Sequence, residues 1–227
     1  IYPSNPKIQE IELSHYAAWV FRPNLRNNYE GNIHYSSIQI RYLNTSRIRF
    51  MRRQTKTYLY NSFDPTRSDS GIALPNNQFY DYVDYSFLFK SSTRNIFSTD
   101  TEISYGSFFN GDKFSISSEF SYRIQPIFNT SIRFSFDSIK LPEPYVSKDI
   151  WLISPKFELT FSKKTFWTTY IQYSSQQDNF GINSRFQWRL APLSDLYLVY
   201  NDNYYSSNSL IPKLRSINLK FTYWINI

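Results

Sequence analysis

Large apolar side chains alternate with polar or charged ones through most of the chain, in runs of about ten residues. Arg185, Gln187 and Arg189, for example, alternate with apolar side chains between residues 185 and 190. Successive side chains of a β-strand point to opposite faces, so this pattern predicts strands with one apolar face and one polar face. About ten residues is also the length that a tilted strand needs to cross a bilayer.

The alternation predicts an all-β protein, and no helical periodicity competes with it. We expect a transmembrane antiparallel up-and-down β-barrel with about twelve strands in this chain, either complete or as part of a larger barrel. The chain then forms a single barrel domain over residues 1–227. The predicted strands are residues 10–22, 31–42, 46–60, 78–90, 95–109, 113–124, 129–140, 149–161, 165–175, 180–190, 194–204 and 214–226.

The predicted connections differ in length on the two sides of the sheet. Short turns at residues 43–45, 91–94, 125–128, 162–164 and 191–193 alternate with longer segments at 61–77, 141–147 and 205–213. Outer-membrane barrels have short periplasmic turns and longer outer loops, so the short turns are expected on the periplasmic side. Asn110, Gly111 and Asp112 predict a tight hairpin turn, whereas Pro155 is unexpected inside a strand.

The two faces of the predicted strands have different chemistry. The apolar positions are expected to face lipid, and they are Phe120, Tyr122, Phe134, Phe136, Phe157, Leu159, Phe161, Phe186, Trp188, Leu219, Phe221 and Tyr223. The polar positions are expected to face the lumen, and they are Asp100, Glu102, Glu119, Arg123, Arg133, Asp137, Lys156, Glu158, Arg185, Gln187 and Arg189. The first sixty residues are less regular, since charged residues occupy both odd-numbered and even-numbered positions between Arg47 and Lys56.

Composition supports a membrane barrel and excludes some chemistry. The mean hydropathy of −0.49 is that of a soluble protein, yet 20% of residues are aromatic. A barrel wall accommodates many outward rings, because lipid replaces the core and aromatic girdles lie at both interfaces. No apolar stretch is long enough for a transmembrane helix. The absence of cysteine excludes disulfides, cysteine-ligated zinc and thiol catalysis.

Four segments resemble a known family, namely residues 71–75, 105–112, 183–200 and 219–224. They are similar to the C-terminal barrel region of Bacteroidota outer-membrane proteins that carry an N-terminal family-9-like carbohydrate-binding domain and an uncharacterised C-terminal domain. The resemblance covers about the last two-thirds of the chain and implies a bacterial outer-membrane location. It also implies that the chain is the C-terminal portion of a longer protein. It implies no activity, and sugar binding is carried over to no residue here.

Charges of both signs on the polar face leave two interpretations open. They could line a pore that selects solutes, or they could pair with one another, which we favour. Arg185, Gln187 and Arg189 could likewise bind an anion, or pair with an acid on an adjacent strand such as Asp195. We expect neither a resident cofactor nor a metal, although outer-loop acids such as Asp178 and Asp202 can bind Ca²⁺ when several oxygens converge.

Catalysis and nucleic-acid binding are not expected. His15 and His34 lie on the first two predicted strands, and no motif singles out a serine as a nucleophile. The net charge of +7 comes from basic residues that are interleaved with acids rather than gathered in one patch. We therefore expect a non-enzyme.

Three functions follow from these patterns. The barrel is either a pore or the membrane anchor of a binding domain outside this chain. Alternatively, it is an accessory subunit that docks a larger outer-membrane complex. The third possibility is a soluble β-sandwich adhesin. The expected partners of a barrel are the bilayer with its lipopolysaccharide leaflet and other outer-membrane proteins.

Overall fold

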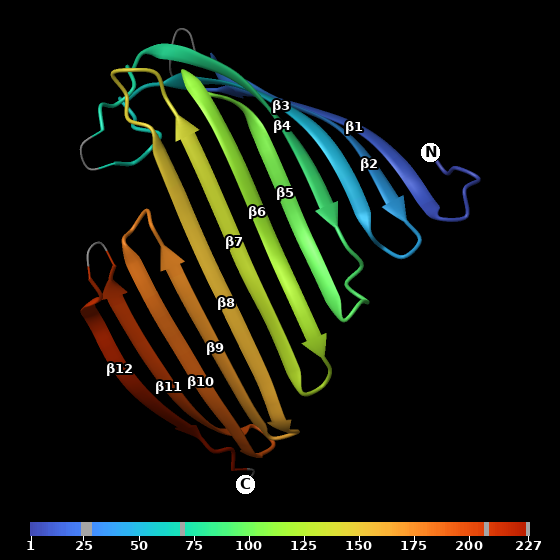
Figure 1. Ribbon diagram of the computed structural model, residues 1–227, viewed down its shortest axis with the longest axis vertical. Coiled ribbons are helices and arrows are strands. Elements are labelled where there is room, and N and C mark those ends of the chain that lie inside the picture. The colour runs from blue at the N-terminus through green and yellow to red at the C-terminus, as the bar shows by residue number, and fades with distance from the viewer. Residues whose placement is uncertain (24–28, 69–70, 207–208, 226–227) are drawn as a thin grey trace. The chain divides into compact units, whose positions relative to one another are not determined.

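The computed structural model describes residues 1–23, 29–68, 71–206 and 209–225, and these residues form twelve strands and no helix (Figure 1). The predicted all-β class and strand number are confirmed. The strands are β1 (Ile8–Phe21), β2 (Tyr29–Tyr42), β3 (Arg47–Leu59), β4 (Gln78–Lys90), β5 (Phe97–Phe108), β6 (Gly111–Ile124), β7 (Phe128–Lys140), β8 (Lys148–Ser162), β9 (Thr165–Ser174), β10 (Asn179–Ala191), β11 (Ser194–Tyr205) and β12 (Ile211–Thr222).

All twelve strands belong to one antiparallel sheet in which each strand pairs with its neighbours in sequence. This is the predicted up-and-down order. The strand order runs from β1 to β12 without joining these two edges, so within the described residues the sheet is not closed. No helix in that part of the chain has the length and hydropathy needed to cross a membrane.

Strand boundaries lie within two residues of the predicted ones except at the last strand. β12 begins at Ile211 and ends at Thr222, whereas the predicted strand extended to residue 226, which lies outside the described residues. Pro155 does lie inside β8, where the ladder to β9 pairs Ile153 and then resumes in the same register at Lys156. The strand therefore accommodates the missing N–H without a change of register.

The predicted turn around Gly111 is shifted by one residue. The turn is formed by Phe109 and Asn110, and Phe109 takes the left-handed conformation with a φ of 54°. Gly111 is instead the first residue of β6. A Cβ atom at Gly111 would lie 2.1 Å from the carbonyl oxygen of Lys140, so this position needs glycine for close approach and not for turn geometry.

Contacts divide the chain into two compact units. The first unit comprises Ile1–Thr93, Thr99–Ser117 and Phe136–Asp149, and the second comprises Arg94–Ser98, Ser118–Ser135 and Ile150–Ile227. The buried apolar side chains belong to the first unit and are Leu74, Tyr80, Leu88, Ile139 and Leu141. There the connection between β3 and β4 folds back on itself, as the Leu74 amide donates to the Phe63 carbonyl at 2.7 Å.

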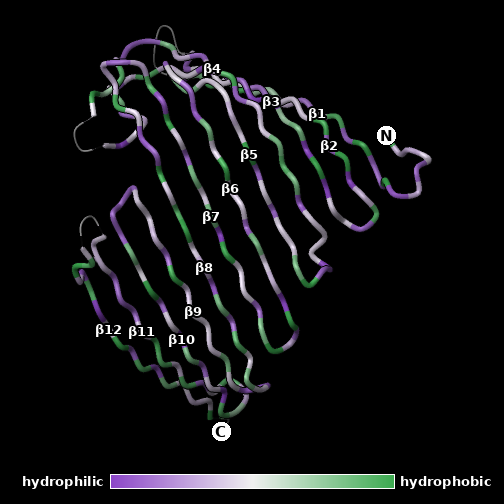
Figure 2. Tube along the Cα trace, viewed as in Figure 1, coloured by the Kyte–Doolittle hydropathy of each residue, from purple (hydrophilic) through white to green (hydrophobic). Residues whose placement is uncertain are grey.

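Burial is inverted relative to a soluble protein. We call the side of each strand that carries the charged and hydroxyl side chains the polar face, and the other side the apolar face; Figure 2 shows the two kinds of residue alternating along the strands. On the polar face Ser154 is only 3% exposed, whereas Leu219 on the apolar face is 70% exposed. A compact monomer of this mass exposes about 11,000 Å², while this chain exposes 15140 Å².

Candidate functional site

The polar face is the candidate site, because the register aligns the predicted lumen residues along it. In the second unit, Glu158 of β8 pairs with Thr168 of β9, which pairs with Arg185 of β10. Lys156 pairs in the same way with Tyr170. Directly opposed residues of an antiparallel ladder share one face, so these side chains line one surface, as the alternation predicted.

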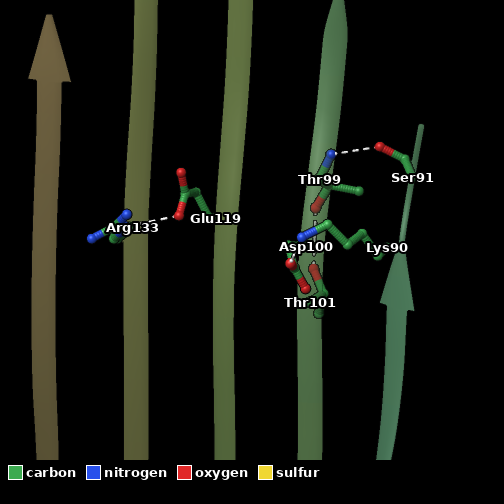
Figure 3. Close-up of polar contacts among 7 residues, drawn as sticks. All are labelled: Lys90, Ser91, Thr99, Asp100, Thr101, Glu119 and Arg133. Carbon is green, nitrogen blue, oxygen red and sulfur yellow. Dashed lines mark hydrogen bonds and ion pairs between the residues drawn. The ribbon is translucent and has the colours of Figure 1, made fainter. Parts of the chain in front are cut away.

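Ion pairs cross this surface. The Arg133 guanidinium donates to Glu119 at 2.8 Å, and Figure 3 shows the two side chains pointing toward one another from β7 and β6. Lys156 contacts Glu158 at 2.8 Å, and the side-chain amide of Asn129 donates to the same carboxylate at 2.7 Å. The acids and bases of this part of the polar face therefore neutralise one another, which confirms the self-paired interpretation for these residues.

Two hollows lie on the polar face of the second unit and share Asn129 and Glu158. The first has a volume of about 430 Å³ and is lined by Glu119, Ser121, Asn129, Ser131, Arg133, Ser154, Lys156, Glu158 and Tyr170. The second has a volume of about 510 Å³ and is lined by Arg123, Gln125, Pro126, Phe128, Asn129, Glu158, Leu159, Thr160, Phe166 and Thr168. Together the two hollows are lined by five of the predicted lumen residues, which are all charged.

The cluster of Arg185, Gln187 and Arg189 is largely satisfied by Asp195. The Gln187 amide donates to the Asp195 carboxylate at 3.0 Å, and the Arg189 guanidinium lies 3.5 Å from it. The Arg189 guanidinium also lies 5.9 Å from the ring centre of Phe166. Pairing with an adjacent strand, the alternative to anion binding that the sequence left open, is therefore confirmed for two of the three residues.

The predicted lumen acids of the first unit are also on the polar face. Asp100 contacts Lys90 at 2.6 Å, as seen in Figure 3, and Asp137 contacts Lys113 at 3.2 Å. Glu102 pairs in register with Leu88 and is half-buried. Asp100 and Asp137 therefore form local ion pairs within the first unit.

The predicted lipid-facing residues lie on the apolar face, and none of them is buried. One cross-strand row makes the point, running from Leu159 through Trp167, Phe186 and Leu198 to Leu219. Elsewhere on this face Phe134 packs against Trp151 with ring centres 5.5 Å apart. Phe120 stacks with Phe97 with ring centres 6.4 Å apart, and the ring centres of Phe114 and Phe136 are 6.3 Å apart. Tyr223 follows the end of β12 and is exposed.

Asp202, which the sequence suggested as an outer-loop acid, lies instead inside β11, in a polar cluster on the apolar face that the sequence did not predict. Asp202 is 2% exposed and accepts hydrogen bonds from the hydroxyls of Tyr200 and Tyr204, each at 2.6 Å. Arg215 of β12 also donates to this carboxylate at 3.0 Å. The sequence does contain a signal for this cluster, because Asp202 occupies a position at which the alternation of the strand calls for an apolar side chain. No group of three or more potential metal ligands occurs in the described part of the chain.

The two histidines also lie on the apolar face, on the first two strands. The Nδ1 of His15 is 2.9 Å from the Ser36 hydroxyl, and the His15 and His34 ring centres are 5.9 Å apart. Nucleophilic catalysis needs a third group that orients the imidazole. Within the described ranges His15 has no hydrogen bond to a carboxylate, so the pair lacks that group.

Comparison of the chain with protein-family models, with curated proteins and with solved structures finds no match in any of the three. The resemblance to Bacteroidota barrels therefore stays a prediction.

Proposed function

We propose that this chain is an integral outer-membrane β-barrel protein, acting as a pore or as the membrane anchor of a binding domain. The observation that carries the proposal is an extensive exposed apolar face opposite a paired, partly buried polar face. Soluble monomers seldom expose a contiguous apolar patch of more than a few hundred Å². Lipid covers such a surface in an outer-membrane barrel, whose interior is polar.

The polar face supports an aqueous interior. Arg133 with Glu119 and Lys156 with Glu158 are partly exposed ion pairs, and hollows of about 430 and 510 Å³ lie beside them. Charges of both signs disfavour strong selection by charge in this region. A pore then admits small polar solutes, whereas an anchor uses the same pairs only to stabilise its interior.

A second candidate function is that of an accessory barrel docked against another outer-membrane protein. It is favoured by a polar interruption in the apolar face of β1–β3, where His15 and Ser36 lie in register with Arg52. Arg52 donates to the neighbouring Gln54 at 3.2 Å, and no carboxylate in the described residues forms an ion pair with it. Lipid contact at such a position is unfavourable by about 2–4 kcal/mol for a basic side chain near the midplane. A polar protein surface accommodates it better.

Membrane insertion is tested by refolding the chain in the presence of phospholipid vesicles. An integral barrel is expected to co-float with the vesicles after an alkaline wash and to migrate differently on a gel before and after boiling. A soluble β-sandwich adhesin predicts the opposite, since it stays in the aqueous fraction and is released by the wash. Loss of the chain from the vesicles would overturn the proposal.

Conductance in planar bilayers then separates the pore from the anchor. Reproducible single-channel steps are expected for a pore. A reconstituted chain that floats with vesicles and yet stays silent is an anchor or an accessory subunit. Co-purification of a stoichiometric membrane partner, lost on Arg52→Leu, would select the accessory subunit.

A further inference from the structure

A ladder of charges crosses the polar face of the first unit near the short turns. Glu10, Arg41, Arg47, Lys90 and Asp100 lie in register on β1 to β5. The ladder is paired at both ends, because Arg41 contacts Glu10 at 2.9 Å and Lys90 contacts Asp100 at 2.6 Å. Figure 3 shows the second of these pairs. Arg47 is left in the centre between two cations that already have carboxylate partners.

The next row of the same face leaves a second arginine in the centre. Arg49 lies in register with Gln39 on one side and Leu88 on the other. Gln39 donates to Glu12 at 3.2 Å, so its amide is engaged. The remaining acid of the row, Glu102, is two strands away beyond Leu88, about 9–10 Å at the usual strand spacing.

Arg47 and Arg49 are short of acceptors. The Nε atoms of both are buried without a hydrogen-bond partner, and neither guanidinium forms an ion pair with any described residue. A buried charged donor without an acceptor is unfavourable. Two positions apart on one strand, the two side chains project from the same face, side by side. The planar guanidinium fork matches the oxygens of a carboxylate or phosphate.

We propose that Arg47 and Arg49 form a binding site for the oxyanion group of a solute, a carboxylate or a phosphate. Glu10 and Asp100 neutralise the flanking cations Arg41 and Lys90, so the uncompensated positive charge of the ladder is that of Arg47. The site goes beyond the proposed membrane function and does not depend on it, because the register of β2–β4 alone creates it. In a pore, the two arginines would form an anion-binding site along the path of the solute. In an anchor, they would hold an anionic ligand.

The test is calorimetric titration of the folded chain in detergent micelles with inorganic phosphate and, separately, with acetate. The double variant Arg47→Gln/Arg49→Gln is expected to bind the preferred anion about tenfold more weakly or worse, from the loss of charge-assisted hydrogen bonds. The matched control is Arg52→Gln/Lys56→Gln, which removes the same charge from the opposite face of the same strand. It is expected to bind as the unmodified chain does.

Two further measurements keep the proposal falsifiable. Arg47→Lys/Arg49→Lys retains the charge and loses the fork, so it is expected to bind more weakly while keeping the β-sheet circular-dichroism spectrum. Equal loss of binding in the control pair would show a general charge effect, and absence of binding to the unmodified chain would overturn the site. If the unmodified chain floats with vesicles but binds neither anion, only this proposal fails.

Discussion

Single residues determine which surface of each strand can tolerate charge. Phe186 and Arg185 are adjacent in β10 and lie on opposite faces, the first aligned with Trp167 and Leu198 and the second aligned with Thr168. The sequence predicted this division correctly for the regular strands. It could not predict which acid a given base would contact, because pairs such as Lys156 with Glu158 lie on one strand whereas Arg133 with Glu119 joins two.

Phe186→Arg is expected to prevent assembly of the barrel, while Arg185→Ala is expected to leave it intact. An arginine on the lipid face is unfavourable by about 2–4 kcal/mol near the midplane. Heat-modifiable gel migration after refolding into vesicles measures the difference. Equal behaviour of the two variants would show that the faces are assigned wrongly.

Acidification is expected to loosen the segment between β3 and β4 through Asp64. Partial burial opposes ionisation of Asp64, but hydrogen bonds from the Thr66 side chain and from the Ser68 and Thr66 backbones prevail and lower its pKa. The stabilisation is present above the ordinary carboxyl pKa and is lost as the pH falls through the lowered value.

The check is an NMR pH titration of the Thr66 and Ser68 amides. Their shifts are expected to move with a midpoint below the usual aspartate range, and Asp64→Asn should abolish that titration. A midpoint above the usual range would contradict the hydrogen-bonded arrangement.

At the scale of elements, the alternation of apolar and polar residues predicted the bounds of eleven strands closely and misplaced those of the last strand. The C-terminal alternation continues through Tyr223 and Ile225, yet β12 pairs with β11 only from Ile211 to Thr222. Periodicity is a property of one strand, whereas the end of a strand depends on how far its partner extends. For the same reason the turn at Gly111 could not be located from its residue types alone, since its glycine serves the approach to β7.

Gly111→Ala is expected to destabilise the sheet by about 1–3 kcal/mol, because the added methyl group meets a backbone carbonyl that cannot move aside. Gly181→Ala is the matched control. Its Cβ would meet the side-chain oxygen of Asn203 at 2.7 Å, and that side chain can rotate away. Urea unfolding in micelles should show a lower midpoint for Gly111→Ala than for Gly181→Ala; the reverse order would contradict the close approach.

At the scale of the whole molecule, the sequence predicted the up-and-down order of the strands. Short turns such as residues 163–164 and 192–193 alternate along the chain with longer segments such as residues 60–77. It could not predict that Arg47 and Arg49 lack carboxylate partners, because β3 carries charge on both faces and the neighbours of each arginine depend on the pairing with β2 and β4. Closure of the sheet likewise depends on whether the first and last strands pair, which the alternation within a single strand does not determine.

Closure can be tested with disulfides, because the chain has no cysteine of its own. Leu13→Cys is combined in turn with Ile217→Cys, Leu219→Cys and Phe221→Cys, all on the apolar face. In a self-closed barrel β1 and β12 are antiparallel neighbours, so one of the combinations is expected to form an intramolecular disulfide on oxidation in vesicles. Exclusively intermolecular disulfides would overturn self-closure and place the closing strands in another chain.

Pairing of every strand with its sequence neighbour has a consequence for how the protein reaches its native state. Each hairpin closes only the loop that joins its own two strands, so the entropy lost per added strand is small. The contact order of the sheet is correspondingly low for an all-β protein, and we expect β1 to β12 to assemble by successive addition of hairpins. In a self-closed barrel, the seam between the first and last strands is then the one pairing that has to wait for all the others.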